Sequence, residues 1–277
     1  MNNYLKKQKL LKRIRNVSLF VTLAAVLVFI GIQPYIVEAF GSDTVFQYVI
    51  FILVALSLGI LFFYESRYSK SEKYIEDAML EINDAGYYYT ARKESNPDCF
   101  AEAVKSDLIA SGYKLKENVT ALELDFDFSA VKGSEYLYLV TLDNVDRNDV
   151  IAYIDSAIYD LTSVKMRSKG NGVIVFVCNN ADAEAIALSK SVKRIFSGKR
   201  VLKIGMAIAE TESSKVYFRG NEAGVIQKLV AAFVMDCKLP IDKKYIGEEK
   251  LPFQIELENN HKDFNLKDFK EGKYYER

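Results

Sequence analysis

Two long stretches without a charged residue dominate the first quarter of the chain. They cover residues 16–37 and 44–64, which is 22 and 21 residues. At about 1.5 Å per residue, a helix of either length crosses the roughly 30 Å hydrocarbon core of a bilayer. Only residues 38–43 join them, which is enough to reverse the chain direction. The pattern therefore predicts a transmembrane hairpin of two helices, with Pro34 near the end of the first.

Basic residues mark one side of this hairpin. Six lie in the first fifteen positions with no acid among them, Arg67, Lys70 and Lys73 follow the second stretch, and the connection holds none. Because basic residues stay on the cytoplasmic side, we expect both termini in the cytoplasm and both spans in the plasma (inner) membrane. A cleaved signal peptide is the alternative for the first stretch. Its length, the lack of a small-x-small cleavage site and the second span count against that alternative.

Beyond the hairpin, the spacing of apolar residues is that of a folded domain. Residues 66–87 have a helical spacing that stops at Gly86, and we expect this helix to continue from the second span. A second helix is expected over 98–110. Residues 122–128 alternate with period two and predict a strand with one acidic face. The acids of that face (Glu123, Asp125 and Asp127) fit either an exposed surface or a metal site.

From Glu135 onward the order of elements becomes specific. Strands are expected over 135–142, 164–167, 173–178 and 201–209, and helices over 148–162 and 181–196. Residues 169–172, Lys-Gly-Asn-Gly, have the composition of a hairpin turn. The order β-α-β-β-α-β predicts an α/β (α+β) fold with a ferredoxin-like βαββαβ unit. A further strand at 215–218 and a helix at 225–234 are expected to follow it.

These patterns divide the chain into five parts. We expect a basic cytosolic N-terminus (1–15), the transmembrane hairpin (16–64), a juxtamembrane helix with a helix and strand extension (65–130), the ferredoxin-like domain (131–237) and a charged C-terminal tail (238–277). The end of the tail, 261–277, mixes charges with Phe and Tyr. Such a segment is expected to be disordered or to fold on a partner.

The charge balance and the cysteines exclude several classes of protein. Lys+Arg and Asp+Glu both number 37, but without the N-terminus and hairpin 31 basic and 35 acidic residues remain, a net charge of about −4. This argues against nucleic-acid binding. Three isolated cysteines and a single His form no metal-ligand cluster, so we expect no metal, no cofactor and no disulfide framework. The cysteines are expected to be small buried apolar residues in a reducing compartment.

Three segments of the predicted domain carry a resemblance to a known family. They are Leu139-Val-Thr-Leu-Asp-Asn-Val-Asp146, Arg167-Ser-Lys-Gly-Asn-Gly-Val-Ile-Val-Phe-Val177 and Gly205-Met-Ala-Ile-Ala209. Together they resemble the GGDEF domain of cyclic-dinucleotide signalling proteins over about residues 135–237. The pattern is most similar to the degenerate GGDEF-like domain of membrane-bound DHH-type phosphodiesterases, which also follows two spans. The DHH portion is not found in this chain. An unrelated ferredoxin-like domain is the alternative.

The departures from the family pattern remove its chemistry. A diguanylate cyclase needs two divalent cations held by carboxylates. The resemblance places Thr141 where the first metal-binding Asp would be, and Asn171 and Gly172 where the two acids of the signature motif would be. Asp143 is then the one carboxylate left. We therefore expect no catalytic residue, no metal site and no cyclase activity.

Binding of a nucleotide or cyclic dinucleotide without turnover remains an expectation for the same positions. The glycines would let a phosphate approach the backbone, the basic residues would supply charge, and Asn144 could bond a base. The residues of this predicted site are Asp143, Asn144, Arg167, Lys169, Gly170, Asn171 and Gly172. The alternative is a Gly-Asn-Gly turn that needs no ligand to explain it.

A second candidate site is a basic segment with no acid in it. Its residues are Lys190, Lys193, Arg194, Lys199, Arg200 and Lys203. In an acidic domain such a segment is expected to dock on anionic lipid headgroups or on an acidic partner. A solvated helix end and loop is the alternative.

The sequence therefore predicts a membrane-anchored, non-catalytic signalling or regulatory protein. Its cytosolic domain is expected to bind a nucleotide or a protein partner, which includes a second copy of the chain. The alternative is a scaffold or accessory subunit of a membrane complex with no small-molecule ligand. The two differ in whether residues around Gly170 bind a nucleotide.

Overall fold

The structure is a computed structural model that describes residues 2–221 and 224–262. Contacts divide it into two compact units. One holds the residues up to Met79 together with those from Glu256, and the other is Leu80–Ile255. We call the first unit the helical hairpin and the second the sheet domain, and each is described by itself.

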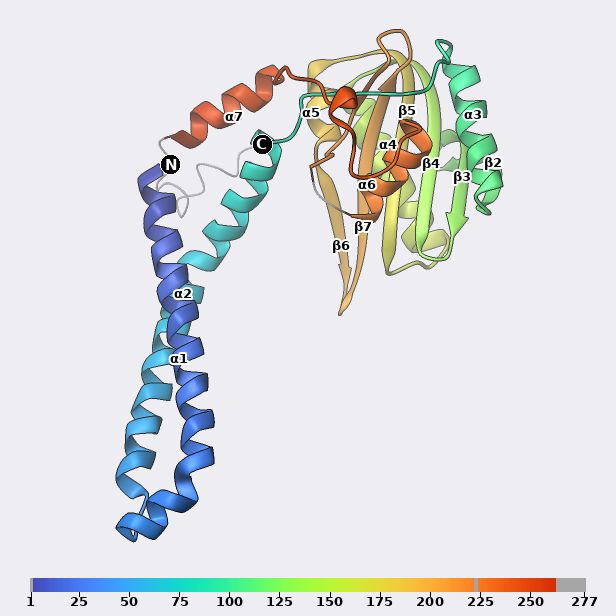
Figure 1. The fold of residues 1–277 in the computed structure, drawn as a ribbon. Coiled ribbons are helices and arrows are strands. Elements are labelled where there is room, and N and C mark those ends of the chain that lie inside the picture. Colours follow the sequence, from blue (N-terminus) through green and yellow to red (C-terminus); the bar gives the residue numbers. More distant parts are fainter. Residues whose placement is uncertain (1, 222–223, 263–277) are drawn as a thin grey trace. The chain divides into compact units, whose positions relative to one another are not determined.

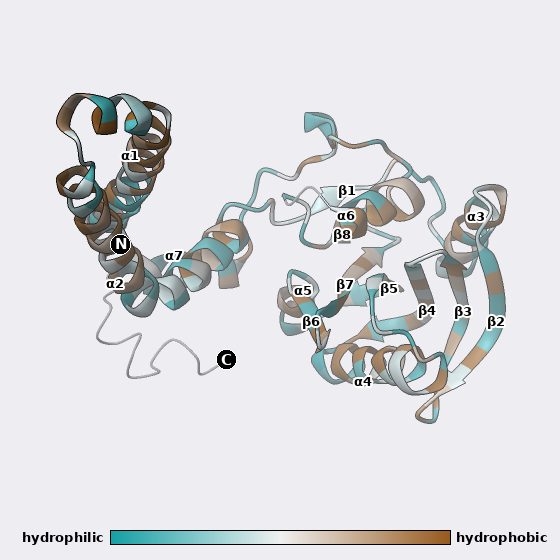
Figure 2. Ribbon diagram, turned by 90° about the horizontal axis from the view of Figure 1, so that it is seen from below, coloured by the Kyte–Doolittle hydropathy of each residue, from teal (hydrophilic) through white to brown (hydrophobic). Residues whose placement is uncertain are grey.

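The helical hairpin consists of α1 (Asn2–Phe40) and α2 (Thr44–Ile82), joined by a short turn. Both are long and apolar enough to cross a membrane, and brown covers much of both in Figure 2. Only 11% of the most apolar stretch of α1 and 6% of that of α2 is buried inside the protein. A core helix of a soluble domain would be mostly buried, so this exposure agrees with helices that face lipid.

Polar contacts join the two helices to each other. The buried Ser57 of α2 is 2.7 Å from the hydroxyl of Ser18 and 2.5 Å from that of Thr22, both in α1. Such interhelical hydrogen bonds are typical of membrane helices. Nearer the N-terminus, ion pairs join Lys12 to Glu72 and Arg15 to Glu65. The helices therefore stay paired beyond their apolar stretches.

The predicted continuation of the second helix past Tyr64 is confirmed. Helix α2 runs without interruption to Ile82, four residues short of Gly86. Just after the end of α2, and within the sheet domain, the side chain of Asp84 is buried.

The sheet domain is built on one eight-stranded sheet with the order β1-β8-β7-β5-β4-β3-β2, and β6 pairs with β7 beside this path. Its strands are β1 (Tyr88–Tyr89), β2 (Lys114–Ala121), β3 (Leu124–Lys132), β4 (Glu135–Val145), β5 (Gly170–Ala181), β6 (Val192–Ser197), β7 (Arg200–Glu210) and β8 (Lys215–Tyr217). The three central strands β4, β5 and β7 are parallel, and the outer pairs are antiparallel.

Helices cover both faces of this sheet (Figure 1). On one face lie α3 (Pro97–Ala110) and α6 (Val225–Leu229), which continues as a π-helical turn to Val234. On the other lie α4 (Arg147–Tyr159), followed by the π-helical turn Asp160–Val164, and α5 (Ala183–Ser189). The strands between these layers are buried on both sides, which explains the near-continuous apolar run Val173–Cys178 in β5.

The mixed α/β class is as predicted, but the strands do not follow the predicted βαββαβ connection. That prediction placed a hairpin between strands at 164–167 and 173–178. Instead, β4 is followed by a helical crossover to its parallel neighbour β5, and β5 by a second crossover to its parallel neighbour β7. The segment 169–172 is therefore the approach to β5 and its first residues, and not a hairpin turn.

Two local predictions were wrong for reasons of tertiary contact. Residues 164–167 are not a strand because the amides of Lys165 and Arg167 bond back to the carbonyls of Asp160 and Leu161, and Met166 has a φ of 51°. The helix predicted to extend to Phe196 ends at Ser189. The rest of it pairs with β7 as β6, turning through Gly198, which has a φ of 59°.

The domain boundaries also differ from those expected from the sequence. The segment 114–132 forms β2 and β3 of the same sheet and is no separate extension. Part of the predicted tail is ordered: Lys243–Tyr245 forms a 3₁₀ turn, and α7 covers Pro252–Lys262. The remainder of the predicted partner-binding tail, 263–277, lies outside the described residues.

Candidate functional site

The amino-terminal edge of the parallel strands joins the basic residues of the two predicted sites. Asn171 of β5 lies beside Lys203 of β7 in the parallel register, and Lys203 lies opposite Arg194 of β6. From the loop before β5, the Ser168 hydroxyl accepts a hydrogen bond of 3.1 Å from Nη1 of Arg200. Two segments that are far apart in the sequence therefore lie at one end of the sheet, which we call the basic edge: residues 165–171 and the β6–β7 hairpin.

A buried network fixes the loop that carries Arg167 and Lys169. The ammonium of Lys165 lies 2.6 Å from the carboxylate of Asp160 and donates to the hydroxyl of Tyr138 at 3.1 Å. The Tyr138 hydroxyl donates in turn to Asp160 at 2.5 Å, and burial raises the pKa of this Tyr far above its usual value. Lys165 thus has its ion-pair partner, Asp160, within the fold, while Arg167 and Lys169 remain exposed.

Gly170 is explained by the fold and not by a ligand. Its φ of 137° is accessible mainly to glycine. A Cβ atom here would lie 2.4 Å from the carbonyl oxygen of Ser134 and 2.6 Å from the ring of Tyr136. Gly172 has no such constraint, since its nearest neighbour would be Ile204 at an ordinary 3.5 Å. The glycines predicted to cradle a phosphate therefore include one that the backbone requires.

Two adjoining hollows lie between the β6–β7 hairpin and the loop before β5 that carries Arg167 and Lys169. One, of about 290 Å³, is lined by Gly133, Ser134, Tyr136, Met166, Arg167, Ser168, Lys169 and Arg200. The other, of about 220 Å³, is lined by Thr162, Met166, Arg167, Ser168, Ile195, Ser197 and Leu202. They share the segment 166–168, so a ligand in one would contact the loop that also borders the other.

The charge in these hollows has one sign. Their charged lining residues are Arg167, Lys169 and Arg200, and all three are basic. An arginine offers a planar fork of donors that matches the oxygens of a phosphate or carboxylate. Serine hydroxyls at Ser134 and Ser168 add neutral hydrogen-bonding groups. The arrangement can bind an anion, and it holds no nucleophile–base pair for catalysis among the residues that line it.

The structure does not bring Asp143 and Asn144 to this site. Both are exposed near the carboxyl end of β4, whose first residue, Glu135, is the one that lies opposite Asn171. Asn144 is nine residues further along the strand, or about 30 Å at roughly 3.3 Å per residue. The predicted nucleotide site therefore divides into two opposite edges of the sheet, and its basic half borders the hollow that Arg167 and Lys169 line.

Lys190 does not belong to the basic surface, contrary to the prediction. Its side chain is 1% exposed and lies 3.0 Å from the equally buried carboxylate of Asp84. It also donates to the carbonyl oxygens of Ala85 and Phe218, at 2.7 and 2.8 Å. Burial lowers the pKa of Lys190 even with Asp84 beside it. The other five residues of the predicted patch (Lys193, Arg194, Lys199, Arg200 and Lys203) are exposed.

Sequence reasoning missed several residues of the hollows. Ser134 comes from the β3–β4 turn and Tyr136 from the start of β4, and nothing in the sequence links them to residues 166–169. Met166 is 79% exposed and lines both hollows. The strand predicted over 164–167 gave no reason to expect Met166 in a loop beside a hollow.

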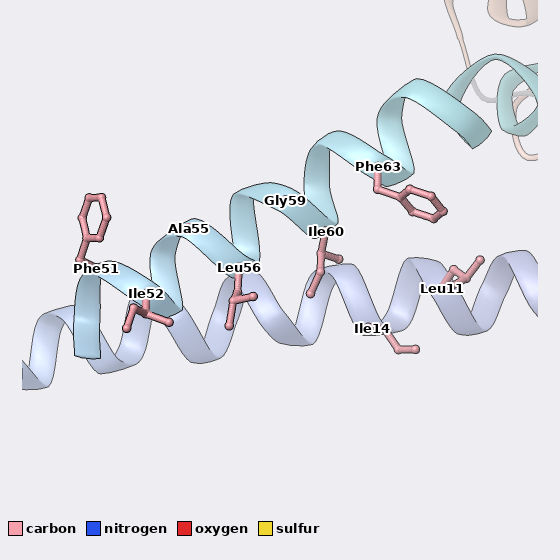
Figure 3. Close-up of a pocket in the computed structure, with 9 residues that line it drawn as sticks. All are labelled: Leu11, Ile14, Phe51, Ile52, Ala55, Leu56, Gly59, Ile60 and Phe63. Carbon is pink, nitrogen blue, oxygen red and sulfur yellow. The ribbon is translucent and has the colours of Figure 1, made fainter. Parts of the chain in front are cut away.

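The hollow within the helical hairpin has a different character (Figure 3). It encloses about 600 Å³ and is lined by Leu11, Ile14, Phe51, Ile52, Ala55, Leu56, Gly59, Ile60 and Phe63. None of these side chains is polar, so the groove fits lipid chains and offers no group to orient a ligand. Within the described residues, no group of three His, Cys, Asp or Glu side chains is placed to hold a metal ion.

Comparison with known proteins adds no family to this description. No protein-family model matches the chain, and no curated protein matches it with significance. The fold and the site thus define a mixed α/β domain, preceded by two helices long enough to span a membrane, with a basic edge at the amino ends of its parallel strands.

Proposed function

We propose that the protein is a membrane-anchored, non-catalytic regulatory protein whose sheet domain binds an anionic ligand of the nucleotide or phosphate class at the basic edge. Anchorage is by α1 and α2 as two spans, with both termini in the cytoplasm. The charge bias of the flanking segments supports this orientation.

One observation carries the proposal: Arg167 and Arg200, 33 residues apart in sequence, border the same hollow. Both are exposed, and neither forms an ion pair within the part of the chain that the structure describes. Both guanidinium groups can therefore bind an anionic ligand. The loop before β5 is fixed by the contacts of Lys165 and does not depend on these two side chains. Two guanidinium groups around one hollow favour a phosphate, which each can bind in bidentate fashion.

The size of the hollow limits the ligand. Sites for drug-sized molecules usually enclose about 300–1,000 Å³, and this hollow of about 290 Å³ is at the lower end. It fits the phosphate end of a nucleotide, with the rest of the molecule lying in the adjoining hollow or in solvent. The GGDEF-like resemblance suggests cyclic dinucleotides as ligands. Of the residues predicted for the nucleotide site, only Arg167 and Lys169 line this hollow, since Asp143 and Asn144 lie at the other edge and Asn171 lines a separate hollow beside α6.

The test is thermal melting of the full chain in detergent with GTP, ATP, c-di-GMP and c-di-AMP, each with and without Mg²⁺. A ligand at 100 times its Kd stabilises the fold by about 2.7 kcal/mol. For a domain of about 150–250 residues this raises Tm by roughly 5–10 °C. The shift should disappear in Arg167→Gln/Arg200→Gln, since both changes remove charge but little packing.

Arg147→Gln is the matched control. Arg147 is exposed at the start of α4, near the carboxyl end of β4, and pairs loosely with Glu184 at 3.3 Å. Its loss should leave the ligand shift unchanged. If no ligand raises Tm in the unaltered protein, the binding proposal fails and a scaffold or accessory subunit without a small-molecule ligand becomes the better description.

A further inference from the structure

The β6–β7 hairpin has a second face, on the side of α6, that the proposed ligand site does not use. In a strand, alternate side chains point to opposite faces. The cross-strand pairs Arg194–Lys203 and Phe196–Val201 therefore share one face, and Ser197–Arg200 lies on the other. Arg194 and Lys203 also border a small hollow with the start of α6, which identifies their face as the one away from the loop that carries Arg167.

The face formed by Arg194, Lys203 and Phe196 places two cations opposite each other and exposes an aromatic side chain next to them. Arg194 and Lys203 are directly opposite each other, and like charges in this position destabilise a strand pair. Neither pairs with a carboxylate in residues 2–221 or 224–262, and no acid occurs between Ala185 and Ala209. The next residue on the face, Phe196, is 69% exposed. A large aromatic side chain beside basic residues is typical of surfaces that meet a bilayer interface.

The hairpin is also shaped to reach a surface. Gly170, the first residue of β5, lies opposite Leu202, so Arg200, Val201 and the turn extend beyond the neighbouring strand. The tip of β6 and β7 projects past the other strand ends in Figure 1. An aromatic residue on a projecting tip can enter an interface without the sheet approaching it closely.

We propose that the Arg194–Lys203–Phe196 face of this hairpin docks on the anionic surface of the bilayer that holds the helical hairpin. The cations bind lipid phosphates, and Phe196 enters the boundary between headgroups and acyl chains. The proposal uses the membrane anchorage proposed above but is independent of any nucleotide. Because the domain is tethered to the bilayer, docking is intramolecular, and a weak surface is sufficient.

The absence of tryptophan from the chain makes the test direct. Phe196→Trp places a single reporter on the face, in the full chain reconstituted in vesicles. In phosphatidylcholine mixed with phosphatidylglycerol, its emission should shift to the blue and be quenched by lipids brominated on their acyl chains. In phosphatidylcholine alone, or in about 1 M salt where the Debye length is roughly 3 Å, both effects should be lost.

A charge variant and a control reporter complete the design. Each basic residue near an anionic surface contributes about fivefold to association. Arg194→Gln/Lys203→Gln in the Phe196→Trp background should therefore weaken docking by about thirtyfold. Ile151→Trp, on an exposed position of α4, should keep the emission of a solvated tryptophan in every vesicle.

Flotation of the chain with the vesicles reports insertion of α1 and α2 separately from docking. If the chain floats but the tryptophan of Phe196→Trp stays unquenched in anionic vesicles, the proposal is overturned and a soluble acidic partner is the better occupant. Quenching that is equal in neutral and anionic vesicles, or unchanged by the charge variant, would also overturn it. If the chain does not float, anchorage fails, and docking on the bilayer that holds the chain fails with it.

Discussion

Replacement of Lys190 by methionine should destabilise the sheet domain more than almost any other loss of a charged side chain. Methionine keeps much of the apolar stem but no donor. The carboxylate of Asp84 would lose its counter-charge, and the carbonyl oxygens of Ala85 and Phe218 would lose their hydrogen bonds. The amide of Gly220 and the hydroxyl of Tyr88 would remain as donors to Asp84, at 3.2 and 2.6 Å.

The magnitude follows from the burial of both charges. Lys190 and Asp84 are each 1% exposed, so solvent cannot replace the lost partner. Removal of one member of a buried pair costs about 3–5 kcal/mol. In a domain of this size, this lowers Tm by roughly 6–20 °C. Asp84→Asn/Lys190→Met should cost less than the sum of its single changes, because each single change leaves one buried charge unpaired and the double variant leaves none.

The assay is denaturant and thermal unfolding of the full chain in detergent, followed by the near-ultraviolet circular dichroism of the tyrosines. Lys193→Met is the matched control, since Lys193 is exposed only three residues away and should change stability by no more than about 0.5 kcal/mol. If Lys190→Met unfolds as the control does, then Lys190 is not the buried partner of Asp84, and the reasoning from burial is refuted.

Two further predictions concern the core and the start of β5. Burial, with Glu210 nearby, raises the pKa of the Cys178 thiol from 9.0 to about 12, so a thiol reagent at pH 8 should label the exposed Cys99 at once and Cys178 only on unfolding. Because the pKa of this thiol is higher in the folded state, its contribution to stability is complete below about pH 9 and is lost as the pH rises toward 12. Rapid labelling of Cys178 in the folded protein would contradict its burial. Gly170→Ala should destabilise the sheet domain by about 1–3 kcal/mol, because Gly170 has a φ of 137° and an added Cβ would lie against the carbonyl oxygen of Ser134. Gly172→Ala should leave the stability nearly unchanged, because the space around Gly172 admits a Cβ. Equal melting temperatures for the two variants would show that β5 does not begin as described.

The sequence by itself determined the elements that depend on local pattern. The two uncharged stretches predicted α1 and α2, and the helical spacing of apolar residues over 66–87 predicted the extension of α2 past Tyr64. Helical and alternating patterns located α3, α4, β4, β5 and β7 to within a few residues. These signals are local, since the apolar side of an element repeats at the period of its own geometry.

Only the tertiary structure decided which residues meet. The sequence places Asp143 and Gly170 in one predicted site, but the parallel pairing of β4 with β5 puts them at opposite edges of the sheet. Conversely, Arg167 and Arg200 belonged to two different predicted sites, and the same strand order brings them around one hollow. Lys190 read as one more exposed cation, because no local pattern shows that Asp84, 106 residues earlier, would enclose it. Strand order and long-range burial are set by contacts between segments, and these have no period along the chain.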